Sequence, residues 1–299
     1  MVIDTETHLF YWARNCRTNP QETMRRHYTW HEHNADLLVA EMDHAGVDKT
    51  FLISYDGEDT RFAAQVAGFD MEDFAGGKKY CLREIAKYPD RFYWYSVIKD
   101  ARLYDTKDLI RQDIERGARG FKLFPAFIAC DLSSDFWLDI CRYLQEQKST
   151  LLISYEFLLP PKTLTIEGYL AQLDKMLTEV PDLPVALLHA GCIDPLLPKG
   201  QLVVDLVKKH KNLYLSNAMP GAVWDDGCEY PFKNLQARVK RLKEAVGADR
   251  LMYATDWPWF EDEMKYKQNI DCFKLHAPYF TPEELALFLG GTAQKFVGD

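Results

Sequence analysis

The stretch IDTETHLFYW, residues 3–12, places three ionisable side chains within five positions near the start of the chain. Asp4, Glu6 and His8 alternate with two threonines, and residues two apart on a β-strand point to the same face of the sheet. If this stretch forms the first strand, the two carboxylates and the imidazole project together. A cation site would explain such a grouping, and the other strands test that interpretation.

Eight short apolar segments recur along the chain, and stretches with helical periodicity separate them. The predicted strands are Val2–His8, Thr50–Tyr55, Phe92–Ile98, Gly120–Phe124, Thr150–Glu156, Pro184–Ala190, Asn212–Asn217 and Arg250–Asp256. The helical patterns include residues 35–46, 108–118, 134–147, 167–180, 200–210 and 235–247. A last helix over residues 281–297 begins with the capping-box-like sequence Thr-Pro-Glu-Glu, and three of the earlier helices are expected to stop at Gly46, Gly117 and Gly247.

Strands that alternate with helices along a whole chain are typical of a parallel (β/α)8 barrel. The sequence therefore predicts a single α/β TIM-barrel domain over residues 1–299, with a long loop after the first strand. The alternative is a doubly wound open sheet. That fold typically has a glycine-rich phosphate-binding turn after its first strand, and this chain has none there.

The composition narrows the class of protein. The formal charge of −9 and the pI near 5.4 argue against nucleic acid or an anionic membrane as partner. No apolar run approaches the ~20 residues of a membrane helix. The seven cysteines are scattered without a CxxC pair, which is typical of reduced thiols in the cytoplasm. We expect a cytoplasmic protein that acts on a small molecule, and homodimerisation stays open.

Ionisable side chains lie where several predicted strands end. The carboxyl ends of barrel strands carry the active site in this fold, and burying such groups elsewhere would be costly. Each group alone has a structural explanation, such as a hydrogen-bonded core histidine or a helix cap, but their shared placement predicts a site. The candidates are Glu6, His8, Lys122, Glu156, His189 and Asp256.

The long loop after the first strand, from Phe10 to about His31, is rich in aromatic and basic residues. Arg14 or Arg26 is expected to pair with a substrate carboxylate, because a guanidinium group matches a carboxylate bidentately. Lys122 and Trp257 are further candidates for substrate binding. These features predict an anionic, aromatic or unsaturated small substrate, and the alternative is a solvated loop packed on the barrel rim.

The chain resembles the amidohydrolase-related (amidohydrolase 2) metal-dependent barrels, in the branch that contains aminocarboxymuconate-semialdehyde decarboxylase and γ-resorcylate decarboxylase. The resemblance spans nearly the whole chain. It rests on the order and spacing of IDTETHLF, EMDHAGVDKTFLI, YPDRFYWYSVI, GARGFKLFPA, LPVALLHAG and ADRLMYATDWPW.

This resemblance implies one divalent ion bound by Glu6, His8 and Asp256, with His189 beside it as catalytic acid or base. Imidazole and carboxylate ligands suit zinc or manganese. In a hydrolysis, Asp256 would accept the proton of the attacking water. A glutamate in place of the family's first histidine resembles the γ-resorcylate-type decarboxylases.

The fifth predicted strand departs from the family pattern. Where the family has a histidine ligand, the sequence reads LLISYEF, so that Ser154 takes the place of the histidine. Glu156 is the ionisable residue of that strand, and we expect it to bind the ion or to accept a hydrogen bond from its water. The alternatives are that Glu156 faces solvent or pairs with Lys122.

Three functions remain open. The first is a metal-dependent hydrolase acting on a small carboxylate-bearing or cyclic substrate, such as a lactone, an amide or an ester. The second is a nonoxidative decarboxylase (carboxy-lyase) of an aromatic or unsaturated acid. The third is a metal-free homologue that binds a small molecule without turning it over, because the histidine ligand of the fifth strand is missing.

Overall fold

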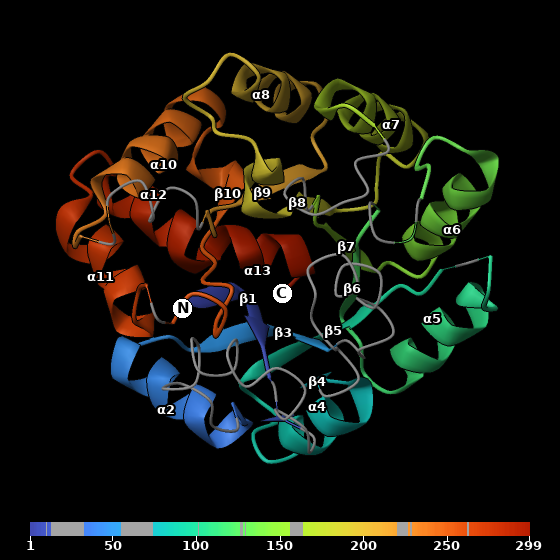
Figure 1. The fold of residues 1–299 in the computed structure, drawn as a ribbon, viewed down its shortest axis with the longest axis horizontal. Coiled ribbons are helices and arrows are strands. Elements are labelled where there is room, and N and C mark those ends of the chain that lie inside the picture. Colours follow the sequence, from blue (N-terminus) through green and yellow to red (C-terminus); the bar gives the residue numbers. More distant parts are fainter. Residues whose placement is uncertain are drawn as a thin grey trace, which may run out of the picture.

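The computed structural model describes residues 1–9, 11–12, 33–54, 74–100, 102–125, 128, 130–155, 164–219, 227, 229–261 and 263–299. Eight parallel strands form its central sheet in the order β1-β3-β5-β6-β7-β8-β9-β10 (Figure 1). Their bounds are β1 Ile3–His8, β3 Lys49–Ser54, β5 Phe92–Val97, β6 Gly120–Leu123, β7 Thr150–Ile153, β8 Val185–Leu187, β9 Leu213–Ser216 and β10 Leu251–Met252. Every predicted strand is present, and their order follows the sequence.

Hydrogen bonds between the first and last strand regions close the sheet into a barrel. The amide of Thr5 donates to the carbonyl of Tyr253 over 2.9 Å, and the amide of Asp256 donates to the carbonyl of Glu6 over the same distance. A parallel bridge also joins Thr7 to Trp257. The (β/α)8 barrel is therefore confirmed, and the doubly wound open sheet is excluded.

A ring of helices surrounds the barrel in Figure 1. The bounds of these helices are α2 Ala35–Ala45, α4 Lys78–Ile85, α5 Thr106–Glu115, α6 Asp135–Glu146, α7 Ile166–Glu179, α8 Gly200–Lys209, α10 Lys233–Val246, α11 Tyr266–His276 and α12 Pro282–Ala286. Local sequence fixes several of their ends. The predicted capping box forms between Thr281 and Glu284, and Gly46 ends α2 in the left-handed conformation that a side chain would strain.

The last helix, α13 (Thr292–Val297), crosses the centre of the view in Figure 1 and covers one end of the barrel. Its Phe296 ring packs edge-on against Tyr214 of β9, within the apolar cluster that fills the barrel. Asp299 then binds Tyr93 and Arg119, which lie at the amino ends of β5 and β6. Because α13 covers the amino ends of the strands, the site is to be sought at their carboxyl ends.

Seven of the eight strands end one to four residues earlier than the sequence predicts, and two of these differences bear on the candidate site. The sixth was expected to reach Ala190 but stops at Leu187, where the turn η3 (Leu188–Cys192) begins. The eighth was expected over Arg250–Asp256, but only Leu251–Met252 pair as a strand. The backbone at His189 and at Asp256, both residues of the candidate site, adopts a positive φ angle that a β-strand does not accommodate.

Two further observations complete the fold. A small antiparallel sheet pairs β2 (Tyr11–Trp12) with β4 (Phe74–Ala75). The rest of the long loop after β1 lies outside the described residues. Among the residues that are described, no helix is both long enough and apolar enough to span a membrane.

Candidate metal centre

Strand β1 contains an irregularity that decides where its ionisable side chains point. Asp4 pairs with Thr50 of β3, but the next pair joins Thr7 to Leu52, so that β1 holds one more residue than its partner between these points. An extra residue of this kind is a β-bulge, and it re-aims the side chains around it. Strict alternation from Asp4 to His8 is therefore interrupted.

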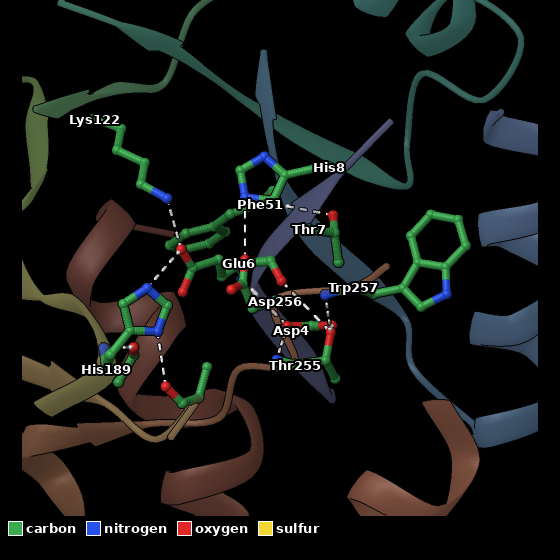
Figure 2. Close-up of polar contacts among 12 residues, drawn as sticks. Asp4, Glu6, Thr7, His8, Phe51, Lys122, His189, Thr255, Asp256 and Trp257 are labelled. Atoms are coloured by element: carbon green, nitrogen blue, oxygen red, sulfur yellow. Dashed lines mark hydrogen bonds and ion pairs between the residues drawn. The ribbon is translucent and has the colours of Figure 1, made fainter. Parts of the chain in front are cut away.

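The bulge separates Asp4 from the other two candidates. The Asp4 carboxylate lies 2.9 Å from the Tyr266 hydroxyl, on helix α11 outside the barrel. Glu6 and His8 lie on the other side of the strand, in the cluster of polar groups shown in Figure 2. The expectation that all three side chains project together is therefore corrected for Asp4, and the reason is the bulge.

Glu6 forms a buried ion pair across the barrel interior. The Lys122 ammonium of β6 lies 2.7 Å from Glu6 Oε1, and the two side chains are 3% and 0% exposed. The other carboxylate oxygen of Glu6, Oε2, is buried and has no hydrogen-bond partner among the described residues. Because a buried carboxylate oxygen without a partner is costly, this atom is positioned for a group that binds there.

His189 approaches Glu6 from the end of β8. Its Nδ1 lies 2.7 Å from the carbonyl oxygen of Ala218, and since a carbonyl only accepts, Nδ1 carries the hydrogen. The Nε2 atom lies 3.6 Å from Glu6 Oε1. In a neutral imidazole this Nε2 is an acceptor that faces a carboxylate, so a proton or a cation between them is needed to make the contact favourable.

The backbone at the two predicted catalytic residues is strained. His189 has a φ of 54° and Asp256 a φ of 56°, and neither is a glycine. Such conformations cost on the order of 1–3 kcal/mol each and persist where the surrounding structure enforces them, often at functional sites. The strain at His189 and Asp256 therefore supports a functional role for both side chains.

Asp256 lies between Glu6 and His8. Its Oδ1 is 3.2 Å from His8 Nε2, and both side chains are nearly buried. Burial, together with the positive charge of Lys122, lowers the pKa of His8 to about 3, although the negative charge of Glu6 opposes the shift. His8 is therefore a neutral imidazole over the ordinary pH range, the form in which a histidine can ligate a metal.

Glu6, His189 and Asp256 each offer one ligand atom, and these atoms lie within 4.8 Å of one another. Two carboxylates and an imidazole are ligands that zinc and manganese accept. The bond from His189 to a backbone carbonyl is the usual support of a metal-binding histidine. With the unpartnered Glu6 oxygen, the donor set fits a divalent cation.

The structure thus gives each predicted site residue a place, where it describes that residue. Glu6 and Asp256 come together, His189 supplies the third converging donor, and His8 contacts Asp256. Lys122 contacts Glu6. The ring of Trp257 is buried, points away from Glu6 in Figure 2 and packs edge-on against His33 at 5.2 Å.

Other predicted residues lie outside the described part of the chain. These are Arg14, Arg26 and Glu156, whose roles stay predictions. Ser154, which replaces the family's histidine, is fully buried, and its amide donates to the Leu123 carbonyl.

Sequence reasoning missed the residues that hold the site in place. The His189 amide donates to the Ser216 hydroxyl, and its ring nitrogen donates to Ala218, both near the end of β9. Thr255 binds Asp4 and so connects the two strands that carry Glu6 and Asp256. A backbone carbonyl has no signature in the sequence, whereas the threonine directly before Asp256 was visible but had no predicted partner.

Known proteins share the family and the fold of this chain. The model of a family described as amidohydrolase matches residues 3–298. No curated protein sequence matches the chain. Several solved structures do, each over nearly its whole length.

Three of these structures are informative. The chain is 19% identical to a probable 2-pyrone-4,6-dicarboxylic acid hydrolase of Acinetobacter baumannii with bound citric acid, with a TM-score of 0.70 and coverage of 100% and 99% of the two chains. It is 15% identical to a zinc-bound amidohydrolase of Burkholderia multivorans, with a TM-score of 0.71 and the same coverage. It is 15% identical to 5-carboxyvanillate decarboxylase of Sphingomonas paucimobilis, with a TM-score of 0.60 and coverage of 99% and 98%. At these identities the likeness establishes the fold alone.

Proposed function

The chain belongs to the amidohydrolase family, and from this membership we propose that it is a metal-dependent hydrolase of a small carboxylate-bearing or cyclic substrate, such as a lactone, an amide or an ester. The observation that carries the proposal is the convergence of Glu6, His189 and Asp256 at the carboxyl ends of their strands. We propose zinc or manganese as the ion, and the zinc-bound relative supports a divalent metal.

The protein's own residues divide the work at this centre. Glu6, His189 and Asp256 would hold the cation, which supplies a Lewis acid that polarises the scissile carbonyl and activates water. Asp256 is the proton acceptor in this proposal, because its Oδ1 lies against His8, a neutral imidazole that orients the carboxylate. The low exposure of these side chains strengthens every electrostatic interaction among them.

Lys122 contributes a positive charge within the same cluster. An ammonium group beside the reacting carbonyl stabilises the negative charge that develops on oxygen, and it attracts an anionic substrate. Together with Arg14 and Arg26, whose role is a prediction from the sequence, it favours a substrate that carries a carboxylate.

Nonoxidative decarboxylation is the second candidate function. Glu6, in place of the family's first histidine, resembles the γ-resorcylate-type decarboxylases, and the fold is similar to that of 5-carboxyvanillate decarboxylase. In that reaction the cation, held by Glu6 and Asp256, would anchor the substrate's carboxylate or phenolate oxygen. His189 would then not ligate the cation but deliver the proton to the carbon that loses CO2. A metal-free binding protein is the third candidate, with Lys122 as the cation that balances Glu6.

Metal analysis combined with a substrate panel tests the three candidates. Purified protein is analysed for bound metal by mass spectrometry, stripped with a chelator and reloaded with zinc or manganese. Hydrolysis of carboxylate-bearing lactones, esters and amides that depends on the metal supports the lead proposal, and metal-dependent release of CO2 from aromatic hydroxy acids supports the second. Protein that binds neither ion and turns over neither class would overturn both enzymatic proposals.

The cellular setting stays a proposal as well. We propose the reducing cytoplasm that the sequence predicts, because the cysteines are scattered along the chain without a CxxC pair. We also propose that the protein binds a small anionic molecule, as the sequence predicts.

A further inference from the structure

We propose that the Lys122 ammonium is a built-in substitute for the metal: it neutralises Glu6 when no ion is bound and competes with the ion for that carboxylate. The inference rests on the proposed metal function and adds a residue that sets how tightly the ion binds. It starts from the ion pair between β6 and β1, in which Nζ lies 2.7 Å from Glu6 Oε1.

The pair is too well buried to be a chance contact. Only 3% of the Lys122 side chain and none of the Glu6 side chain is exposed. Taking both charges out of water is costly, so each requires a compensating partner. The ammonium also lies 4.7 Å from the centre of the Phe124 ring, and the face of an aromatic ring attracts a cation. The barrel therefore holds this ammonium at Glu6 from two sides.

The same Glu6 carboxylate belongs to the candidate metal centre. Glu6 Oε1 lies 2.7 Å from Lys122 Nζ and 3.6 Å from His189 Nε2, so the ammonium and the imidazole approach one atom. A divalent ion ligated by Glu6 and His189 would share this carboxylate with the ammonium. Two like charges on one buried carboxylate repel each other strongly, because water does not screen them.

The charged groups around the centre also favour competition between Lys122 and the ion. Glu6 and Asp256 bring two carboxylates to the centre, and Lys122 brings one ammonium group. Lys122 thus offsets part of the negative charge that attracts a divalent ion. The cost of this arrangement is a weaker metal site, and its benefit is a protein whose centre keeps its shape without metal.

The decisive experiment compares metal binding in the wild type and in Lys122→Met, which keeps an unbranched side chain one atom shorter and removes its charge. Both proteins are stripped with a chelator, and the dissociation constants for zinc and for manganese are measured by isothermal titration calorimetry. We expect Lys122→Met to bind the ion at least about tenfold more tightly. We also expect its metal-free form to melt at a lower temperature, and the ion to raise its melting temperature more than that of the wild type.

A matched control comes from a second lysine. Lys78 of α4 forms a pair of the same kind with Asp113 of α5, with Nζ 2.6 Å from the carboxylate, and neither residue belongs to the metal centre. Lys78→Met is expected to lower the melting temperature without changing the dissociation constants. Lys122→Arg, which keeps the positive charge, is expected to retain the weak binding of the wild type.

The outcomes separate this inference from the proposed function. Equal or weaker metal binding in Lys122→Met, or equally tight binding in Lys122→Arg and Lys122→Met, would overturn the competition between the ammonium and the ion. If neither the wild type nor Lys122→Met binds zinc or manganese, the proposed metal function itself is overturned. If Lys122→Met does not fold, Lys122→Gln replaces it and the same comparison applies.

Discussion

Asp4 and Thr255 join the first and last strand regions of the barrel through two hydrogen bonds to one carboxylate. The Thr255 amide donates to Asp4 Oδ1 over 3.0 Å, and its hydroxyl donates to Oδ2 over 2.6 Å. Thr255 directly precedes Asp256, and Asp4 stands two residues before Glu6. The pair therefore fixes the spacing between two donors of the candidate metal centre, although neither residue points into it.

Removing the Thr255 hydroxyl should weaken this connection. In Thr255→Val the side chain keeps its shape, but Asp4 loses one buried donor and the Trp257 amide loses its acceptor, which lies at 3.1 Å. We expect the free energy of unfolding to fall by ~1–3 kcal/mol, measured by denaturant titration of the metal-free protein. Thr255→Ser keeps the hydroxyl and serves as control. Equal stability in the valine and serine variants would show that the connection contributes nothing.

His189 is predicted to determine metal binding. The sequence suggested an acid or base beside the ion, but the structure places its Nε2 among the three converging ligand atoms. We therefore expect His189→Asn to weaken the binding of zinc by at least ~10-fold and to abolish turnover. Metal content and activity are measured on the same preparation. If His189→Asn keeps its metal but loses turnover, His189 is not a metal ligand, and it acts as the acid or base that the sequence predicted.

The alkaline limit of stability should depend on Tyr93. Burial, followed by the hydrogen bond to Asp299, raises the pKa of Tyr93 to about 12, above its ordinary value of 10.0. The folded protein thus holds this proton where the unfolded chain releases it. The stability that Tyr93 contributes is therefore complete below pH 10 and is lost as the pH rises toward 12.

The measurement for Tyr93 is a difference between two proteins. We expect the wild type to be more stable than Tyr93→Phe at pH 9, and this advantage to shrink steadily in denaturant titrations up to pH 11. Other tyrosines titrate in both proteins, so their effects cancel in the difference. A difference that stays constant with pH would contradict the prediction.

The sequence predicted the barrel because the evidence for it is local and repeated. Each strand is an apolar segment with a helical pattern behind it, and the eight segments stand in the order of the sheet. The candidate donors Glu6 and Asp256 were predicted because charged side chains at strand ends are conspicuous. These features need no knowledge of distant contacts.

What the sequence did not predict depends on contacts between residues far apart in the chain. The bulge that turns Asp4 toward Tyr266 arises from the pairing of β1 with β3, and alternation within β1 alone gives the wrong direction. The early end of β8 reflects the left-handed backbone at His189, which is held by Ser216 and Ala218. Neither feature has a local sequence pattern.

The ion pair between Glu6 and Lys122 yields a last prediction, made for the metal-free protein. Glu6→Gln leaves the ammonium buried beside a neutral amide, and breaking a buried pair from one side typically costs ~3–5 kcal/mol. Lys122→Met leaves the carboxylate buried without its cation and should cost a similar amount. The double variant removes both charges, so its loss of unfolding free energy should be well below the sum of the two single losses. If the loss of unfolding free energy in the double variant equals the sum of the two single losses, the two charges do not stabilise each other. The position of Glu6 would then depend on strand β1 and not on Lys122.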